Sequence, residues 1–130
     1  MNVVHEEKDF VVVNKPAGVL THRTPHSFES ALADEAVEGY PEMAKVGDLP
    51  ELRPGVVHRL DKDTSGVIVF ARNQKFFEYL KRCFQEGKIK KTYLALVWGK
   101  TPERGTIDAP IGLKSGTTRR SILARNMKMV

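Results

Sequence analysis

Residues 56–66, VVHRLDKDTSG, place two carboxylates within a short polar segment. Asp61 follows the basic pair His58 and Arg59, and Asp63 stands two residues further on. An ionised carboxylate can attack an electrophilic carbon, remove a proton, or share acid–base work with a second carboxylate. The basic neighbours favour the ionised form of Asp61, since opposite charges stabilise each other. This segment is therefore the first candidate for a catalytic site.

The same spacing also fits a purely structural turn. Asp61 and Asp63 can cap a turn through their carboxylates. Thr64, Ser65 and Gly66 can complete it, by hydroxyl hydrogen bonds and by a tight approach of the backbone to the next strand. A glycosidase with paired carboxylates is a further interpretation, but no aromatic cluster for sugar binding lies nearby in the sequence. Spacing alone favours the structural turn.

The composition indicates one globular domain. The chain has 130 residues, of which 41% are hydrophobic and 28% charged, and this suits one core of modest size. No apolar run reaches the length of a membrane span, and the first residues do not resemble a secretory signal. A single cysteine, Cys83, fits a reducing cytoplasm and a packing role in a helix. The four histidines show no spacing typical of metal ligands.

Charge is distributed unevenly along the chain. Residues 1–80 carry 9 Lys+Arg against 13 Asp+Glu, a net charge of −4, whereas residues 81–130 carry 12 against 3, a net charge of +9. This asymmetry points to a polyanionic partner for the C-terminal half. Lys88, Lys90 and Lys91 concentrate the positive charge, and they fit a contact with a phosphate backbone as well as they fit a solvated strand end.

The sequence pattern predicts more strands than helices. Two short strands are expected within residues 3–15, ending at Pro16, and further strands over 66–73, 90–99, 105–107 and 121–124. Helices are expected over 27–39, with Ser27 as N-cap and Gly39 as stop, and over 74–87, ending at Gly87. Residues 40–55 contain three prolines and predict a loop. We therefore expect an α+β fold with a mostly antiparallel or mixed sheet and two flanking helices.

Four segments in this order resemble the RluA-type pseudouridine synthases. HRLDKDTSG, residues 58–66, is similar to the family's HRLDxxTSG signature. NKPAGVLTH at 14–22, IKKTYLALVWG at 89–99 and GTIDAPIG at 105–112 resemble the segments that precede and follow it. The resemblance covers nearly the whole chain. It implies the incomplete form of that family's fold, and an enzyme that isomerises uridine in RNA to its C-glycoside.

The resemblance also implies roles for particular residues. Asp61 matches the catalytic aspartate, which acts on a base that has left its stack. Arg59 matches a residue that braces the vacated space, and His58 beside it is expected to bind substrate. Tyr93 matches the active-site tyrosine, whose ring can stack on uracil; considered alone it would be a core strand residue. Thr64, Ser65 and Gly66 are expected to support the site structurally. Neither a metal nor an organic cofactor is implied.

The resemblance stops before the end of the family's catalytic domain. A later family segment, Gly-Arg-x-His-Gln-Ile-Arg, has no counterpart in residues 113–130. Residues 1–130 are thus expected to form the N-terminal portion of such a domain, with its activity in question and with strand edges open to association. The expected partner is rRNA or tRNA, without a membrane. The alternative is a module that binds RNA without turnover, and neither the target uridine nor the oligomeric state can be read from the sequence.

Overall fold

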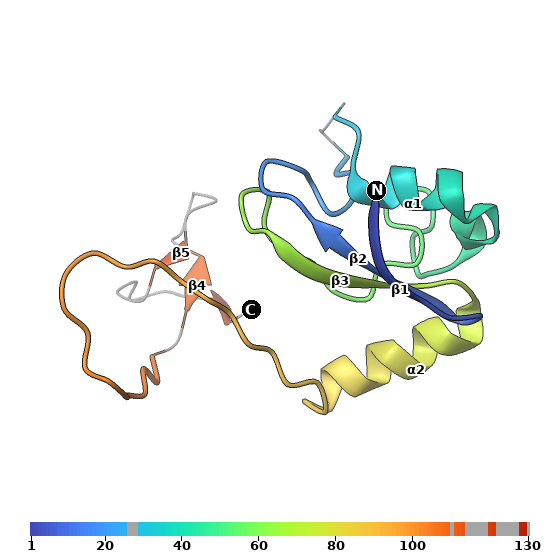
Figure 1. Cartoon of the computed structure of the whole chain (residues 1–130). Coiled ribbons are helices and arrows are strands. Elements are labelled where there is room, and N and C mark those ends of the chain that lie inside the picture. The colour runs from blue at the N-terminus through green and yellow to red at the C-terminus, as the bar shows by residue number, and fades with distance from the viewer. Residues whose placement is uncertain (26–28, 110, 114–119, 122–127, 130) are drawn as a thin grey trace. The chain divides into compact units, whose positions relative to one another are not determined.

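The computed structural model describes residues 1–25, 29–109, 111–113, 120–121 and 128–129 (Figure 1). The chain forms two compact units, Met1–Thr92 and Tyr93–Val130. Each unit is described by itself. The first contains both α-helices and the segment around Asp61.

Three antiparallel strands form the sheet of the first unit. In the order β1-β2-β3 they are Asn2–Glu6, Phe10–Lys15 and Gly66–Ala71. The β-branched runs in β2 and β3 favour this extended conformation. β2 is the central strand, and its six residues pair in continuous register with β3. All three strands agree with the sequence-based prediction.

One face of this sheet is covered by α1, Leu32–Gly39, and it holds the main core. Side chains alternate along the strands, so that Val11 and Val13 of β2 share this face with Ile68 and Phe70 of β3. These four are fully buried, and residues from α1 and the following loop pack with them: Leu32, Ala33, Ala36, Met43, Val56 and Leu60. Burial on this scale is the main source of stability for the unit.

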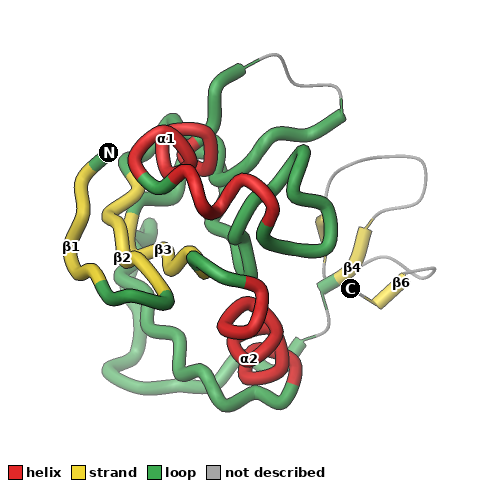
Figure 2. The backbone as a smooth tube through the Cα atoms, turned by 90° about the vertical axis from the view of Figure 1, so that its right-hand side faces the viewer, coloured by secondary structure: helices red, strands yellow, loops and turns green. Residues whose placement is uncertain are grey.

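The second helix, α2, spans Gln74–Gln85 and lies on the opposite side of the sheet (Figures 1 and 2). Asn73 caps it, because its side chain accepts a hydrogen bond of 2.9 Å from the Phe76 N–H. The ring of Phe76 stacks on Phe10, the first residue of β2, with 5.1 Å between the centroids. Gly87 follows the helix with a φ of +67°, as its predicted stop requires, and Cys83 is buried.

The first helix begins later than the sequence pattern predicts. Its first residue is Leu32, whereas the expected N-cap, Ser27, lies outside the described residues. The cause is a contact with another segment: Leu20 pairs with Ala31, and its carbonyl accepts a hydrogen bond from the Leu32 N–H. Asp34 then accepts a hydrogen bond from the Ala31 N–H at 2.8 Å, which fixes the start of the helix.

The predicted loop after α1 contains a short helix. A 3₁₀ helix, η1, spans Pro41–Lys45, with proline in its first turn, where the missing N–H costs nothing. Its Met43 is fully buried in the main core. The prediction of irregular structure over residues 40–55 was therefore wrong for these five residues.

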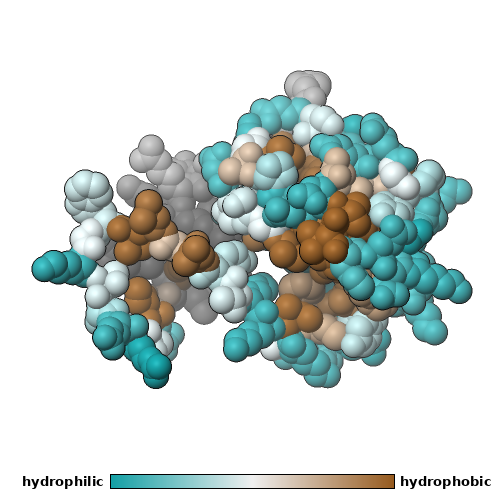
Figure 3. Space-filling model, viewed as in Figure 1, coloured by the Kyte–Doolittle hydropathy of each residue, from teal (hydrophilic) through white to brown (hydrophobic). Residues whose placement is uncertain are grey.

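The second unit differs most from the prediction. Its described strands are the two-residue β4, β5 and β6, at Gly112–Leu113, Arg120–Ser121 and Lys128–Met129. The strands predicted over 90–99 and 105–107 are absent. Of the strand predicted over 121–124, residues 122–124 lie outside the described residues. A strand needs a partner edge, and residues 93–98 pair with no strand among the described residues of this unit. Leu94, Leu96 and Trp98 there are fully exposed to solvent. The space-filling view shows brown, apolar residues at the surface of both units (Figure 3).

The predicted fold class is confirmed. The described strand pairs are all antiparallel, and two α-helices flank the sheet of the first unit. Within the described residues, no helix combines the length and apolar character that a membrane crossing requires. The described part also contains no cluster of three or more side chains suited to holding a metal ion.

Candidate active site

The chain reaches Asp61 along the outer edge of β3. Val56 forms an antiparallel bridge with Phe70, and the carbonyl of Gly55 accepts a hydrogen bond of 2.9 Å from the Ala71 N–H. Two residues later, Nε2 of His58 accepts a hydrogen bond of 3.0 Å from the backbone N–H of Val69. Residues 55–58 therefore run antiparallel to β3, and the Asp61 turn connects them to the start of that strand.

Leu60, directly before Asp61, is fixed by a threonine from a distant part of the sequence. The hydroxyl of Thr21 donates a hydrogen bond of 2.8 Å to the Leu60 carbonyl, and its oxygen accepts one of 3.2 Å from the Leu60 N–H. Both residues are buried. Because one hydroxyl satisfies both backbone groups, the chain is held here without a strand partner.

Lys62, directly after Asp61, is held by a buried lysine. Lys15 has an exposed fraction of 0%, and its ammonium donates to the carbonyls of Pro16, Val19 and Lys62 at 2.9, 2.6 and 2.8 Å. Three acceptors match the three N–H donors of an ammonium group. Gly18 adds a backbone hydrogen bond to the same Lys62 carbonyl at 2.9 Å. Sequence reasoning assigned no role to Lys15 or Thr21, and their place in the segment 14–22 was the only available signal.

Burial lowers the pKa of Lys15, while the carboxylates of Asp63 and Asp61 act in the opposite direction. The buried ammonium is thus close enough to influence both acids of the turn. Its positive charge complements the negative charge on Asp61, which adds to the effect expected from Arg59.

The turn itself is closed by backbone groups. The Thr64 N–H donates a hydrogen bond of 3.1 Å to the Asp61 carbonyl. Gly66 has a φ of +135°, a conformation that residues with a side chain rarely adopt. The side chains of Thr64 and Ser65 have no hydrogen-bond partner among the described residues, so the backbone alone shapes this part of the turn.

The Asp61 carboxylate is open to solvent and does not cap the turn. Its exposed fraction is 80%, and within the described residues its only polar partner is Arg59, with 3.5 Å between Oδ1 and the guanidinium. The Arg59 side chain is 58% exposed. A fixed backbone therefore presents a solvent-accessible carboxylate with a cation beside it. This arrangement suits a nucleophile or base that meets a ligand from outside.

His58 contributes no charge to this pair at neutral pH. Its ring stacks on Phe84 of α2, with 4.8 Å between the centroids and 20° between the planes. Burial, followed by the nearby Lys91 ammonium, lowers the pKa of His58 to about 4. The positive charge next to Asp61 therefore comes from Arg59 and Lys15.

The pKa of His58 predicts a loss of stability in mild acid. Between pH 6.5 and about 4 the unfolded chain binds a proton at His58 while the folded chain does not, so the free energy of unfolding falls as pH falls. Because the ring keeps some contact with solvent, we expect a loss of about 2–3 kcal/mol across this window. Urea unfolding at a series of pH values measures it. His58→Phe is the control, and an equal pH dependence in that variant would contradict the assignment.

The remaining predicted residues lie on both units. Lys91 places its ammonium over the Phe84 ring, 5.4 Å from the centroid, and so lies near His58. Lys88 pairs with Glu86 at 2.6 Å, and Lys90 is exposed. Tyr93 belongs to the second unit, where it is 62% exposed.

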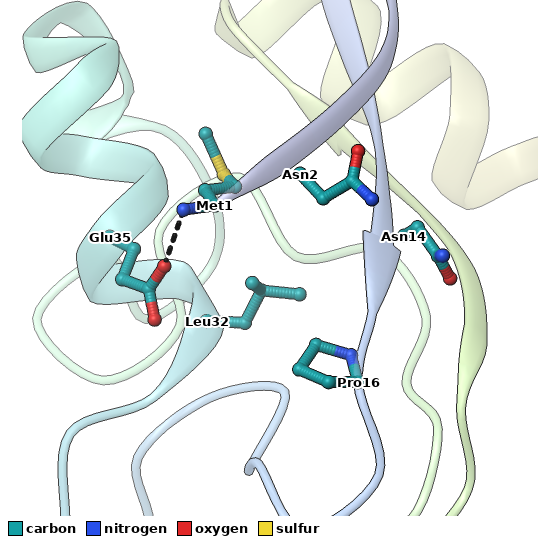
Figure 4. A pocket seen from close by; sticks show the side chains of 6 residues that line it. All are labelled: Met1, Asn2, Asn14, Pro16, Leu32 and Glu35. Atoms are coloured by element: carbon teal, nitrogen blue, oxygen red, sulfur yellow. Dashed lines mark ion pairs between the residues drawn. The ribbon is translucent and has the colours of Figure 1, made fainter.

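A separate cavity lies between β1, β2 and α1 (Figure 4). Its volume is about 360 Å³, and it is lined by Met1, Asn2, Asn14, Pro16, Leu32 and Glu35. An ion pair of 2.9 Å between the N-terminal ammonium and the Glu35 carboxylate stands at one side. Asp61 does not line this cavity, which therefore forms no part of the candidate site.

Comparisons with known proteins point to one family. The profile of the family described as RNA pseudouridylate synthase matches residues 9–129. A relative from Chloroflexus aurantiacus, named as an uncharacterized RNA pseudouridine synthase, is 48% identical over 76% of this chain and 30% of its own. A relative from Aquifex aeolicus with the same description is 38% identical over 85% of this chain and 35% of its own. The ribosomal large subunit pseudouridine synthase D of Nitrosomonas europaea is 35% identical over 86% of this chain and 31% of its own.

The match extends over nearly all of this chain, which in turn spans about a third of the length of these curated relatives. It includes the Asp61 turn and the segment with Lys15 and Thr21 that holds it. The chain therefore belongs to the RNA pseudouridylate synthase family.

Proposed function

We propose that this chain carries the catalytic aspartate of an enzyme that converts uridine in RNA to pseudouridine. The observation that carries the proposal is the Asp61 carboxylate, exposed and beside Arg59 on a turn whose backbone is held from both sides. A catalytic group held in place by its backbone needs little reorganisation when substrate arrives. Membership of the RNA pseudouridylate synthase family supports the reaction type.

The reaction rearranges one nucleoside without loss of atoms. The bond between N1 of uracil and C1′ of ribose breaks, and a bond between C5 and C1′ forms, while C5 releases a proton and N1 gains one. As an ionised nucleophile, Asp61 attacks the sugar and holds it while the base turns; as a base, it removes a ribose proton instead. Both roles need an ionised carboxylate, whose negative charge the cations Arg59 and Lys15 complement.

Three further groups are proposed to contact the RNA. Arg59 occupies the space that the flipped nucleotide leaves, since its long side chain is largely exposed at the turn. Tyr93 stacks on uracil, a contact worth about 1–3 kcal/mol against an unstacking cost of a few kcal/mol. Lys88, Lys90 and Lys91 contact RNA phosphates beside the turn.

The proposed substrate is ribosomal RNA. The Nitrosomonas relative is named for the large ribosomal subunit, and its 35% identity over most of this chain supports a similar target. Transfer RNA is the other substrate class to be tested.

Replacing Asp61 with asparagine is expected to lower pseudouridine formation at least about a thousandfold, because the amide keeps the shape of the side chain but loses its charge. Transcribed large-subunit rRNA and tRNA are incubated with the purified chain, and pseudouridine is mapped. Asp63→Asn is the matched control, since Asp63 is exposed on the same turn. Pseudouridine from Asp61→Asn at the level of the unmodified chain would reject the proposal.

A second candidate function is RNA binding without turnover. The observation that favours it is charge, because residues 81–130 carry a net charge of +9, which suits contact with a phosphate backbone. RNA retention without product, by this chain and by a chimera extended with C-terminal residues of the Chloroflexus relative, would support the binding module. Product from the chimera alone would support the enzyme and assign the missing chemistry to the added residues.

A further inference from the structure

His58 occupies the place of a missing strand partner at the edge of β3. The N–H groups of Val69 and Ala71 point away from β2, and Ala71 donates to the carbonyl of Gly55 in the usual manner of a β-ladder. At Val69 the acceptor is a side chain, since Nε2 of His58 receives the hydrogen bond at 3.0 Å. Without that nitrogen, Val69 would keep an unpaired N–H at a partly buried position.

The same ring also contacts the helix on that side of the sheet. It stacks on Phe84 of α2, with 4.8 Å between the centroids. The hydrogen bond fixes the imidazole along the strand, and the stacking fixes the plane of the ring. His58 is thus held to two elements at once, one residue before Arg59 and three before Asp61.

Arg59 lies between two fixed neighbours. His58 is held by Val69 and Phe84, while Leu60 is held by the Thr21 hydroxyl and buried in the core. The Arg59 side chain itself is mostly exposed, and its only described partner is the Asp61 carboxylate at 3.5 Å. Its direction therefore depends on the backbone on either side and not on packing around the guanidinium.

We propose that His58 is a positioning residue, which sets Arg59 against Asp61 through its hydrogen bond to Val69 and its stacking on Phe84. The expected effect of His58 on pseudouridine formation rests on the proposed function. Its expected effect on the structure of the Asp61 turn does not. We propose this positioning role in place of the substrate contact that the sequence predicted for His58. Nε2 of His58 already accepts the hydrogen bond from the Val69 N–H. Because Nε2 is the acceptor, the proton of the neutral ring lies on Nδ1.

Two substitutions separate the two contacts of the ring. His58→Phe keeps an aromatic ring that can stack on Phe84 but has no acceptor for the Val69 N–H. His58→Gln loses the ring but places an amide oxygen near the position of Nε2. The first readout is amide hydrogen exchange by NMR, at Val69 and at Thr64, whose N–H closes the Asp61 turn. The amide of Val13 in the central strand serves as the reference for any change in global stability.

In His58→Phe, exchange at Val69 and Thr64 relative to Val13 is expected to accelerate about tenfold or more, and His58→Gln is expected to restore it to within about threefold. Unchanged relative exchange at Thr64 in His58→Phe would overturn the proposal, whether or not the chain forms pseudouridine. Equal acceleration in both variants would also overturn it, because the acceptor that His58→Gln offers to the Val69 N–H would then not hold the turn.

The second readout is pseudouridine formation. His58→Phe is expected to lower kcat about tenfold with little change in KM for RNA, and His58→Gln is expected to recover most of that loss. A raised KM with unchanged kcat would assign His58 to substrate contact and reject positioning. If neither the unmodified chain nor the extended chimera forms product, the proposed function fails, and the exchange measurements decide the positioning role independently.

Discussion

Replacement of Lys15 by methionine is expected to lower the free energy of unfolding by about 3–5 kcal/mol. Methionine fills a similar volume but leaves the carbonyls of Pro16, Val19 and Lys62 without the ammonium that now binds all three. Gly18 still donates to the Lys62 carbonyl, so the loss falls mainly on the other two. Urea unfolding monitored by circular dichroism measures the change.

Lys62→Met is the matched control for this substitution. Lys62 lies on the same turn, but its ammonium is exposed and pairs with Glu29 at 2.7 Å. Exposed ion pairs contribute little to stability, so this variant should unfold close to the unmodified chain. If both variants had the same stability, the three hydrogen bonds of Lys15 would only balance the cost of burying its charge.

Replacement of Gly55 by alanine is expected to cost about 3 kcal/mol or more. Gly55 has a φ of +67°, and a Cβ there would lie 2.5 Å from the carbonyl oxygen of Ala71 and 2.8 Å from Cε of Met43. Met43 can move, but the Ala71 oxygen belongs to β3. The hydrogen bond from the Ala71 N–H to the Gly55 carbonyl would have to lengthen, at the point where the chain turns toward Asp61.

Gly87→Ala separates the two causes of this loss. Gly87 has the same φ of +67°, but nothing lies within 4 Å of a Cβ built there. Its replacement should therefore cost only the backbone strain, about 1 kcal/mol. Thermal unfolding of both variants gives the difference. Similar losses would show that the segment at Gly55 moves away from β3 without cost.

Local sequence patterns predicted the elements of the first unit, because each carries its own signal. The β-branched runs of β2 and β3 form strands, and α2 begins directly after its cap Asn73 and ends before Gly87. Patterns failed where a distant segment decides the outcome. The pairing of Leu20 with Ala31 places the start of α1 later, and residues 93–99 have strand composition but no strand partner among the described residues of the second unit.

The candidate site was predictable in its side chains and not in its support. Arg59 and Asp61 are close in sequence, so their contact required little of the fold. Lys15 and Thr21 contact the turn across 47 and 39 residues, and no spacing rule links positions so far apart. Lysine is also rarely buried, so the residue type at position 15 predicts an exposed side chain. The neutral state of His58 likewise depends on burial between β3 and α2.

The turn around Asp61 is held almost entirely through peptide groups: both backbone groups of Leu60, the carbonyl of Lys62 and the N–H of Thr64. The side chains at positions 62 and 63 are exposed and take no part in these hydrogen bonds. Those two positions therefore offer attachment points for a fluorophore or spin label, a few residues from the Asp61 carboxylate. A reporter placed there would register binding of the proposed RNA substrate while the scaffold beneath it stays intact.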